Sequence, residues 1–273
     1  MKIAIFSDIH GNDVAFEAAV NDAKNRGATE FIIAGDMVSD YPLSSQAIER
    51  ARSLTNHIVR GNRESYFQKY HSSQDAHWKE YKQFAGMLWS FSHMKDEDFR
   101  FINSLPEQIE IIIDDKLSFY VTHYINDVNA FIPQMPQKVL VCGHVHRPAV
   151  SEFDDKVYIN AGSVGVNMSI GFNAEYILVD YSNGVTNIQI IHVPYEYEVL
   201  KAALNDKTLI DNEDAMNWFK ILLSTQRTGQ NYISELFIMS EKLKAERGYE
   251  CYDMPNEIWD ELISMYKSNR IIE

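Results

Sequence analysis

The chain has 273 residues, of which 45% are hydrophobic and 23% charged, so it can bury a substantial core. Its formal net charge of −14 argues against duplex DNA and an anionic membrane surface as partners, but not against a small phosphorylated ligand held by bound cations. The two cysteines form no CxxC pair and no apolar stretch reaches membrane-spanning length, so we expect a cytoplasmic protein without disulfides.

The N-terminal part of the chain alternates short apolar runs with helical patterns. The runs 3–6, 31–34 and 57–59 predict strands, and the segments 13–26 and 44–54 between them carry small and apolar residues at helical spacing. This alternation predicts parallel βαβ units. Each predicted strand ends in a polar turn that contains Asp or Asn. Because open α/β sheets bind ligands at the carboxyl ends of their strands, these turns are the first candidates for a site.

A segment rich in aromatic residues, 65–105, follows directly and is predicted to be a helical insertion. Its rings are those of Tyr66, Phe67, Tyr70, Trp78, Tyr81, Phe84, Trp89 and Phe91. Two interpretations stay open. The rings could fill the core of a small helical layer, or the segment could be a lid whose rings stack on a nucleobase.

The middle of the chain predicts consecutive strands, and hence antiparallel pairing and mixed sheets. The predicted strands are 108–113, 117–122, 138–142, 157–160, 175–181 and 185–193. Asp114-Asp115 and Asn183-Gly184 are the expected hairpin turns.

The chain from Glu196 to the end has a helical pattern, with Trp259, Leu262 and Ile263 on one amphipathic face. We therefore predict a core of residues 1–195 that carries the insertion. A helical extension of residues 196–273 is expected to pack on that core through this face.

Seven residues that follow the predicted strands have side chains suited to metal ions: Asp8, His10, Asp36, Asn62, His123, His144 and His146. Oxygen and imidazole ligands without thiolates suit manganese, iron, zinc or cobalt in a catalytic site. Seven ligands are too many for one catalytic ion, which keeps an open position, but they suit two ions bridged by a carboxylate, for which Asp36 is the natural choice. Any one of these residues could instead have a structural role; Asn62 beside Gly61, for example, could be a turn residue.

In order and spacing, these residues resemble the motifs of calcineurin-like metallophosphoesterases, which read D-x-H, G-D, G-N-[H/C]-[D/E], a lone His and G-H-x-H. The matching segments are Asp8-Ile9-His10, Gly35-Asp36, Gly61-Asn62-Arg63-Glu64, His123 and Gly143-His144-Val145-His146. The resemblance covers residues 1–205 and is closest to the small bacterial and archaeal phosphodiesterases, whose N-P-G-S-like loop is similar to Asn160-Ala161-Gly162-Ser163. It implies a four-layer α/β/β/α sandwich with two mixed sheets. It also implies that Asp8, His10 and His146 hold one ion, that Asn62, His123 and His144 hold the other, and that Asp36 binds both.

The same resemblance implies two transition-metal ions, with manganese first, then iron, and zinc or cobalt as alternatives. It implies a phosphohydrolase whose metal-activated hydroxide cleaves phosphodiesters or phosphoanhydrides, in small nucleotides such as diadenosine tetraphosphate. Asp36, Asn62, Arg63 and His144 would be the catalytic residues. A phosphomonoesterase, a protein phosphatase and a non-catalytic interaction protein on the same fold stay open as alternatives.

Three further residues are expected to contact substrate: Asn12, Arg63 and Tyr124. Asn12 can both cap the helix that begins at residue 13 and orient substrate. Arg63 stands where many relatives carry the histidine that protonates the leaving group; an arginine cannot donate this proton near neutral pH, but it can bind phosphate oxygens. The alternative is a surface ion pair between Arg63 and Glu64. Tyr124 stands where this branch usually has glycine, so it narrows that side of the pocket.

Overall fold

The computed structural model describes residues 1–73, 76–168, 171–182 and 185–272, so the predicted turn at 183–184 lies outside the described residues. The strands are β1 (Lys2–Phe6), β2 (Glu30–Ile33), β3 (Gln108–Ile112), β4 (Ser118–Thr122), β5 (Val139–Cys142), β6 (Ala149–Phe153), β7 (Lys156–Asn160), β8 (Asn173–Ser182) and β9 (Val185–Pro194). The α-helices are α1 (Asp13–Asn25), α2 (Ser44–Leu54), α3 (Asn62–Ser73), α4 (Ala85–Ser92), α5 (Asp96–Ser104), α6 (Val128–Phe131), α7 (Tyr197–Ala203), α8 (Lys207–Ile210), α9 (Glu213–Thr228), α10 (Tyr232–Arg247) and α11 (Asn256–Ser268). Short 3₁₀ helices are η1 (Ala76–Glu80), η2 (Lys82–Phe84) and η3 (Ile132–Gln134).

The strands form two mixed sheets, as predicted. The first has the order β2-β1-β8-β9, in which β1 runs parallel to β2 and antiparallel to β8. The second has the order β3-β4-β5-β7-β6, in which β4, β5 and β7 are parallel and the two outer strands are antiparallel to their neighbours. The parallel strands β1, β2, β4 and β5 all carry predicted ligands just beyond their carboxyl ends.

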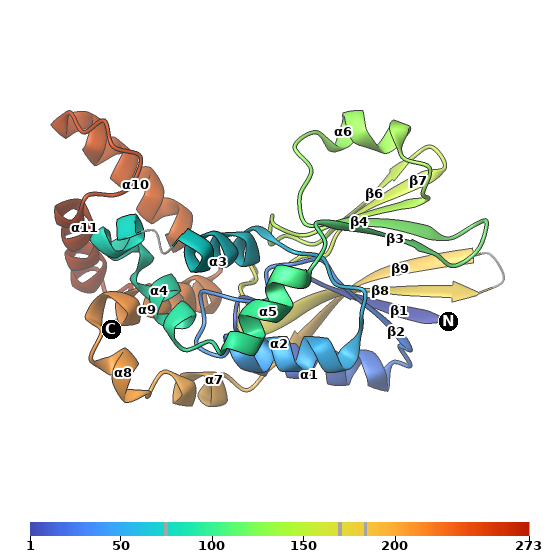
Figure 1. The fold of residues 1–273 in the computed structure, drawn as a ribbon, viewed down its shortest axis with the longest axis horizontal. Coiled ribbons are helices and arrows are strands. Elements are labelled where there is room, and N and C mark those ends of the chain that lie inside the picture. Colours follow the sequence, from blue (N-terminus) through green and yellow to red (C-terminus); the bar gives the residue numbers. More distant parts are fainter. Residues whose placement is uncertain (74–75, 169–170, 183–184, 273) are drawn as a thin grey trace.

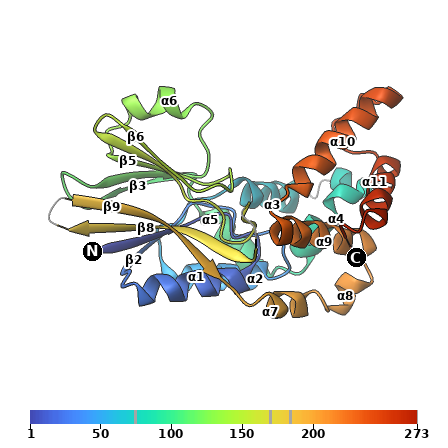
Figure 2. The same cartoon turned by 180° about the vertical axis from the view of Figure 1, so that it is seen from behind.

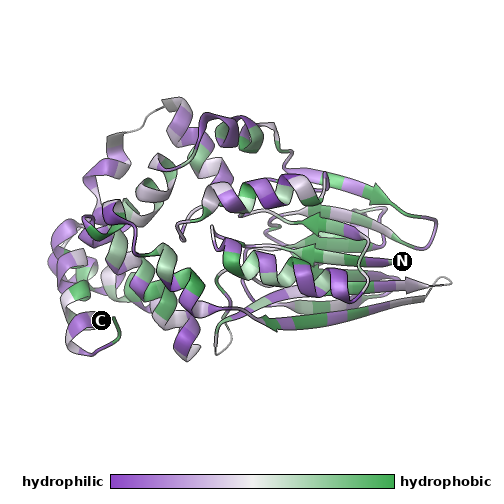
Figure 3. Cartoon of the chain, turned by 90° about the horizontal axis from the view of Figure 1, so that it is seen from below, coloured by the Kyte–Doolittle hydropathy of each residue, from purple (hydrophilic) through white to green (hydrophobic). Residues whose placement is uncertain are grey.

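The two sheets pack face to face, with helices on both outer faces (Figures 1 and 2). The buried layer between them contains Ile5 and Ile177 from one sheet and Phe119 and Val141 from the other. On one outer face, α1 and α2 cover residues such as Phe6, and on the other, α6 and η3 cover Leu140 and Cys142. Figure 3 shows the apolar residues concentrated in the strands and on one side of each helix that packs against them. The predicted α/β/β/α sandwich is confirmed.

Two strand predictions differ from the structure. The predicted strand 57–59 forms only a single parallel bridge, between Ile58 and Ile33. Beyond this bridge the chain leaves the sheet, and the backbone N–H of Arg60 donates to the carbonyl of Pro106 instead of to β2. Conversely, β6 was not predicted. It is an edge strand that is largely exposed, so it shows no buried apolar run.

The insertion and the C-terminal extension lie together beyond the carboxyl ends of the parallel strands such as β1, at the left of Figure 1. The helix α9 packs against α4, where Phe219 meets Trp89 edge to face at 6.0 Å. The helix α11 contacts η2, where Lys82 pairs with Asp260. Trp259, Leu262 and Ile263 are buried in the same apolar cluster as the residues under the first sheet. No helix in the described part of the chain is both long and apolar enough to cross a membrane.

Candidate metal centre

The fold brings all seven predicted ligands to one edge of the sandwich. Asp8 and His10 follow β1, Asp36 follows β2, and Asn62 begins α3. His123 follows β4, and His144 and His146 follow β5. Two sheets and one helix therefore contribute to a single site, which faces the helical part of the molecule.

The backbone of this site is held in an uncommon conformation. Five of the seven ligands have positive φ angles: 52° for Asp8, 51° for His10, 55° for Asp36, 72° for His144 and 59° for His146. The left-handed region costs a non-glycine residue of the order of 1 kcal/mol or more, and such residues cluster at functional sites. This local cost is offset by the rest of the fold, which turns these side chains toward one another.

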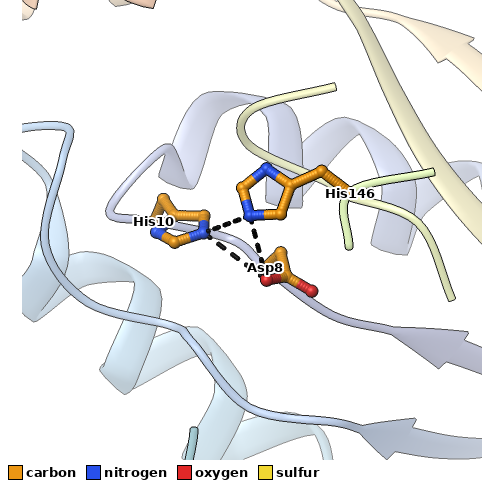
Figure 4. Close-up of side chains that lie close together, drawn as sticks. All are labelled: Asp8, His10 and His146. Carbon is orange, nitrogen blue, oxygen red and sulfur yellow. Dashed lines mark hydrogen bonds and ion pairs between the residues drawn. The ribbon is translucent and has the colours of Figure 1, made fainter. Parts of the chain in front are cut away.

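The first group of predicted ligands is Asp8, His10 and His146, whose side chains converge in Figure 4. The Nε2 atoms of the two histidines are 3.0 Å apart, and Asp8 Oδ1 lies 3.5 and 3.2 Å from them. Asp8 Oδ1 is buried and accepts no well-aligned hydrogen bond from any described residue. One carboxylate oxygen and two imidazole nitrogens that face one another at 3.0–3.5 Å form a set of atoms that fits a metal ion.

The second group is Asn62, His123 and His144. The Asn62 amide oxygen lies 3.0 Å from His123 Nε2 and 2.8 Å from His144 Nδ1. Asp36 Oδ2 lies between the two groups, 3.3 Å from His123 Nε2 and 3.9 Å from His10 Nε2. The other oxygen, Asp36 Oδ1, accepts the backbone N–H of Arg63 at 2.7 Å, so Oδ2 is the oxygen turned toward both groups.

The far side of three ligand rings is fixed by a hydrogen-bond acceptor. Nδ1 of His123 lies 2.7 Å from the Ala34 carbonyl, and Nδ1 of His146 lies 2.9 Å from the Val166 carbonyl. Nδ1 of His10 lies 2.8 Å from a carboxylate oxygen of Asp40. An acceptor behind Nδ1 sets the tautomer and leaves Nε2 to bind metal.

The carboxylates and the histidines of the site stabilise one another's charged forms. Burial opposes the charged form of His10 and His123, but the carboxylates around them outweigh it and raise the pKa of His10 to about 9 and that of His123 to about 10. Burial also opposes ionisation of Asp8 and Asp36, yet the facing histidines lower the pKa of both. The pKa of His144 is lowered by burial and by the charge of His123, which favours the neutral form of the ring that a metal ion requires.

Glu64 has a structural role that rules out the surface pair with Arg63. It is fully buried, and its carboxylate accepts the backbone N–H groups of Asp36, Met37 and Gly61 at 2.7–2.9 Å. Burial and the charge of Asp36 raise its pKa. The alternative of an exposed Arg63–Glu64 pair is therefore wrong. Glu64 instead ties the loop that carries Asp36 to the turn that carries Asn62.

The partner of Arg63 is Asp40, which the sequence reading missed. Asp40 Oδ2 lies 3.1 Å from Arg63 Nη2, and Asp40 Oδ1 accepts the indole N–H of Trp218 at 3.1 Å. The same carboxylate stands behind His10, so one side chain links a ligand, the arginine and the C-terminal extension. Burial opposes its ionisation, but Arg63 and His10 lower its pKa strongly. No motif marks Asp40, because it lies in a polar loop four residues beyond Asp36.

The structure corrects the second role predicted for Asn12. Its side chain caps α1 by accepting the backbone N–H of Ala15 at 3.1 Å, as predicted. Its amide also donates to the Gly165 carbonyl and the Tyr195 hydroxyl, and the residue is completely buried. No group of Asn12 is left for substrate, so the prediction that it orients substrate is wrong.

Two of the predicted substrate contacts stand at the edge of the centre. Tyr124 is half exposed, with its ring centroid 4.6 Å from that of His144. Arg63 lines a cavity of about 290 Å³, as do the predicted ligands His10, Asp36, Asn62, His144 and His146. The backbone at two motif positions lies very close to the carboxylates of Asp36 and Asp8, which is possible because both positions are glycine. A Cβ on Gly61 would lie 2.2 Å from Asp36 Oδ1, and one on Gly143 would lie 2.5 Å from Asp8 Oδ2.

Comparison with known proteins identifies similar chains. Residues 1–184 match the family described as "Calcineurin-like phosphoesterase superfamily domain". An uncharacterized protein of Methanocaldococcus jannaschii is 29% identical over 238 residues, with 73% of this chain and 89% of that protein covered. A metallophosphoesterase from Sphaerobacter thermophilus has a similar fold, with a TM-score of 0.61 and 21% identity over 79% of this chain and 100% of its own. A hypothetical protein from Pyrococcus horikoshii gives a TM-score of 0.61 and 16% identity over 81% and 97%.

Proposed function

The chain belongs to the calcineurin-like phosphoesterase superfamily, and from this premise we propose that it is a dimetal phosphohydrolase acting on phosphodiester or phosphoanhydride bonds of small nucleotides, such as diadenosine tetraphosphate. One observation carries the proposal: a single oxygen, Asp36 Oδ2, stands between two groups of facing metal-binding atoms. A protein that had lost catalysis on this fold would have no need to keep both groups complete.

The metal-binding side chains fall into two groups, one for each ion, with one carboxylate shared between them. Asp8, His10 and His146 would hold one ion, Asn62, His123 and His144 the other, and Asp36 both. When bound, two such ions supply a water of lowered pKa and positive charge beside the phosphate oxygens.

Arg63 adds a fixed positive charge to the wall of the cavity that the predicted metal ligands line. Burial opposes that charge, but Asp40 and Asp36 outweigh it and raise the pKa of the guanidinium further, so it stays protonated at any working pH. Asp40 holds one Nη in place, and the remaining N–H groups can donate to phosphate oxygens as negative charge develops on them. Arg63 therefore stabilises negative charge on the phosphate oxygens and does not act as a general acid.

The test is a panel of metals and substrates. Metal-free protein is loaded with manganese, iron, cobalt, zinc or magnesium and assayed with bis-p-nitrophenyl phosphate, diadenosine tetraphosphate, p-nitrophenyl phosphate and a phosphopeptide. We expect metal-dependent cleavage of the diester and of the polyphosphate, with binding of two ions per chain. Cleavage of the phosphopeptide or of the monoester alone would replace the proposal with a phosphatase. No cleavage with any metal, despite two bound ions, would contradict it.

A further inference from the structure

A second, larger cavity opens beside the metal centre. Its volume is about 650 Å³, within the range of small-molecule sites, whereas the cavity at the ligands has about 290 Å³. The two cavities share four lining residues, Asp40, Arg63, Trp218 and Ile233. The two cavities are therefore neighbours, and the Arg63–Asp40 ion pair belongs to the walls of both.

The walls of this larger cavity come from the insertion on one side and from the extension on the other. Tyr66 of α3 and Phe237 of α10 are half-exposed aromatic rings that both line it. Trp78 packs edge to face on Tyr66 with a centroid distance of 6.1 Å, and Trp218 packs edge to face on Phe237 at 6.4 Å; both tryptophans also line the cavity. Each exposed ring is thus supported by a second ring, which leaves two rigid aromatic surfaces for a planar group.

The cavity wall also contains a polar group that has no hydrogen-bond partner among the described residues. Ser240 of α10 is 1% exposed and lines the cavity, and its hydroxyl makes no hydrogen bond to any described residue. A buried polar group is normally hydrogen-bonded, so this hydroxyl lacks a partner that a ligand can supply. Farther along the wall, Asp253 accepts from Gln83 at 2.7 Å and lies 2.5 Å from His77, which makes that wall polar.

We propose that this cavity binds the nucleoside part of a nucleotide whose phosphate lies at the metal centre, with the base between Tyr66 and Phe237 and a hydrogen bond to Ser240. This inference rests on the proposed function. A base suits the cavity because it combines flat faces with hydrogen-bonding edges, whereas an alkyl chain would leave the buried hydroxyl unpaired. A phenyl group would likewise offer the Ser240 hydroxyl no partner. Arg63, shared by both cavities, marks the position of the phosphate next to the ribose.

The experiment compares two ligands that differ only in the base. Binding of adenosine 5′-monophosphate and of ribose 5-phosphate to the manganese-loaded chain is measured by calorimetry, and the ratio of the two dissociation constants is the readout. We expect the monophosphate with the base to bind about tenfold more tightly or better in the wild type. A ratio near one in the wild type would overturn the inference.

Two variants locate the effect in the cavity. Ser240→Leu fills the space and Tyr66→Ala removes an exposed ring, so each should lower the ratio several-fold. Tyr66→Ala carries little risk to folding because the ring is half exposed. The matched control is Ser264→Leu, at an exposed serine of α11 that lines neither cavity, and it should keep the wild-type ratio. If both cavity variants keep that ratio, the base binds elsewhere and the inference is wrong.

The outcome can be separated from that of the proposed function. Cleavage of bis-p-nitrophenyl phosphate by the loaded wild type, together with a ratio near one, would leave the phosphohydrolase intact and remove only the nucleoside site. A large ratio of dissociation constants without cleavage of any substrate would support the nucleoside site and contradict the phosphohydrolase. The two results are independent because the ratio measures binding and not turnover.

Discussion

The oxygen Asp36 Oδ2 lies between the two groups, 3.9 Å from Nε2 of His10 and 3.3 Å from Nε2 of His123. We predict that Asp36→Asn lowers kcat/KM by more than the roughly 10–100-fold typical of a lost partner behind a ligand, because it weakens both ions at once. Activity is measured across manganese concentrations with bis-p-nitrophenyl phosphate.

Two controls accompany this variant. Asp8→Asn removes a carboxylate of the first group and should be compensated in part by high metal concentration. Asp154→Asn changes an aspartate that also has positive φ, in the exposed turn between β6 and β7, and should leave activity unchanged. Near wild-type activity of Asp36→Asn at micromolar manganese would show that Asp36 does not bridge.

Arg63 predicts which leaving groups the site tolerates. Alkyl esters leave as alkoxides that need a proton, whereas nucleotide anhydrides and aryl esters leave as weaker bases. General acid catalysis contributes about 10²–10⁴-fold, so without it kcat/KM should fall steeply as the pKa of the leaving group rises. The measurement is kcat/KM over a series of diesters for the wild type, Arg63→Ala and Arg63→His.

Histidine at this position should flatten the dependence, and alanine should lower every rate while keeping its slope. A shallow slope in the wild type would mean that another group supplies the proton.

The raised pKa values of His10 and His123 predict that metal binding releases protons. In the metal-free chain both rings are charged at pH 7.5, because their pKa values are about 9 and about 10. Both must be neutral to bind metal, so loading should release close to two protons at this pH, and metal affinity should rise with pH until both pKa values are passed. Calorimetry in buffers of different ionisation enthalpy counts the protons.

The same two histidines also make the stability of the metal-free chain depend on pH. In the metal-free chain these two charges stabilise the fold below pH 6.5, and that contribution is lost as the pH rises through 9 to 10. Release of no protons at pH 7.5 would mean that the rings are already neutral.

At the residue scale, sequence reasoning succeeded where a motif fixed both residue type and spacing. All seven predicted ligands meet at one edge. It failed for Asp40 and for the substrate role of Asn12, because both depend on which side chains from distant segments come to lie nearby. Asn12 became buried under Tyr195, and Asp40 became buried under Trp218, contacts more than 170 residues apart in the chain.

At the scale of elements, α9 supports the metal centre through one hydrogen bond. The indole of Trp218 packs on Gly86 of the insertion and donates to Asp40, which in turn lies behind His10. We predict that Trp218→Phe keeps most of the packing but weakens manganese binding roughly tenfold, since partners behind ligands typically contribute that much. Calorimetric titration of the metal-free protein is the measurement.

The extension offers a closely matched control. Trp259 is also buried, and its indole also donates to an aspartate, Asp214, at 2.8 Å, but it stands on α11 away from the ligands. Trp259→Phe should lower the melting temperature about as much as Trp218→Phe while leaving manganese affinity unchanged. Equal metal affinities in the two variants would contradict a link from α9 to the site.

Most elements could be predicted because their patterns are local. The buried runs of β1, β2 and β5 and the amphipathic face of α11 are visible in a few consecutive residues. The exposed edge strand β6 lacks such a run, and the segment 57–59 has one but finds a partner for only a single bridge. The packing of the insertion against the extension could not be predicted from the sequence. The periodicity of apolar residues indicates that a helix has an apolar face, but it does not indicate which segment covers that face.

For the whole molecule, the extension completes the apolar core of the insertion. Met87 and Trp89 of α4 are buried in the same cluster as Phe219 and Trp259. We predict that a chain ending at residue 195 exposes this surface and aggregates or melts early. Size-exclusion chromatography and thermal unfolding of the truncated chain measure this. A monodisperse chain as stable as the full protein would show that residues 196–273 form an independent module.

The position of β1 has a consequence for synthesis of the protein. The strand lies inside its sheet, with Ile3 opposite Glu30 on one side and opposite Val179 on the other. At translation speeds of roughly 5–20 residues per second, the ribosome reaches β8 on the order of ten seconds after it has made β1. During that interval one edge of an apolar strand has no neighbour, which is the arrangement most prone to pair with other chains. We therefore expect the edge of β1 that later pairs with β8 to be open to other chains until β8 is made.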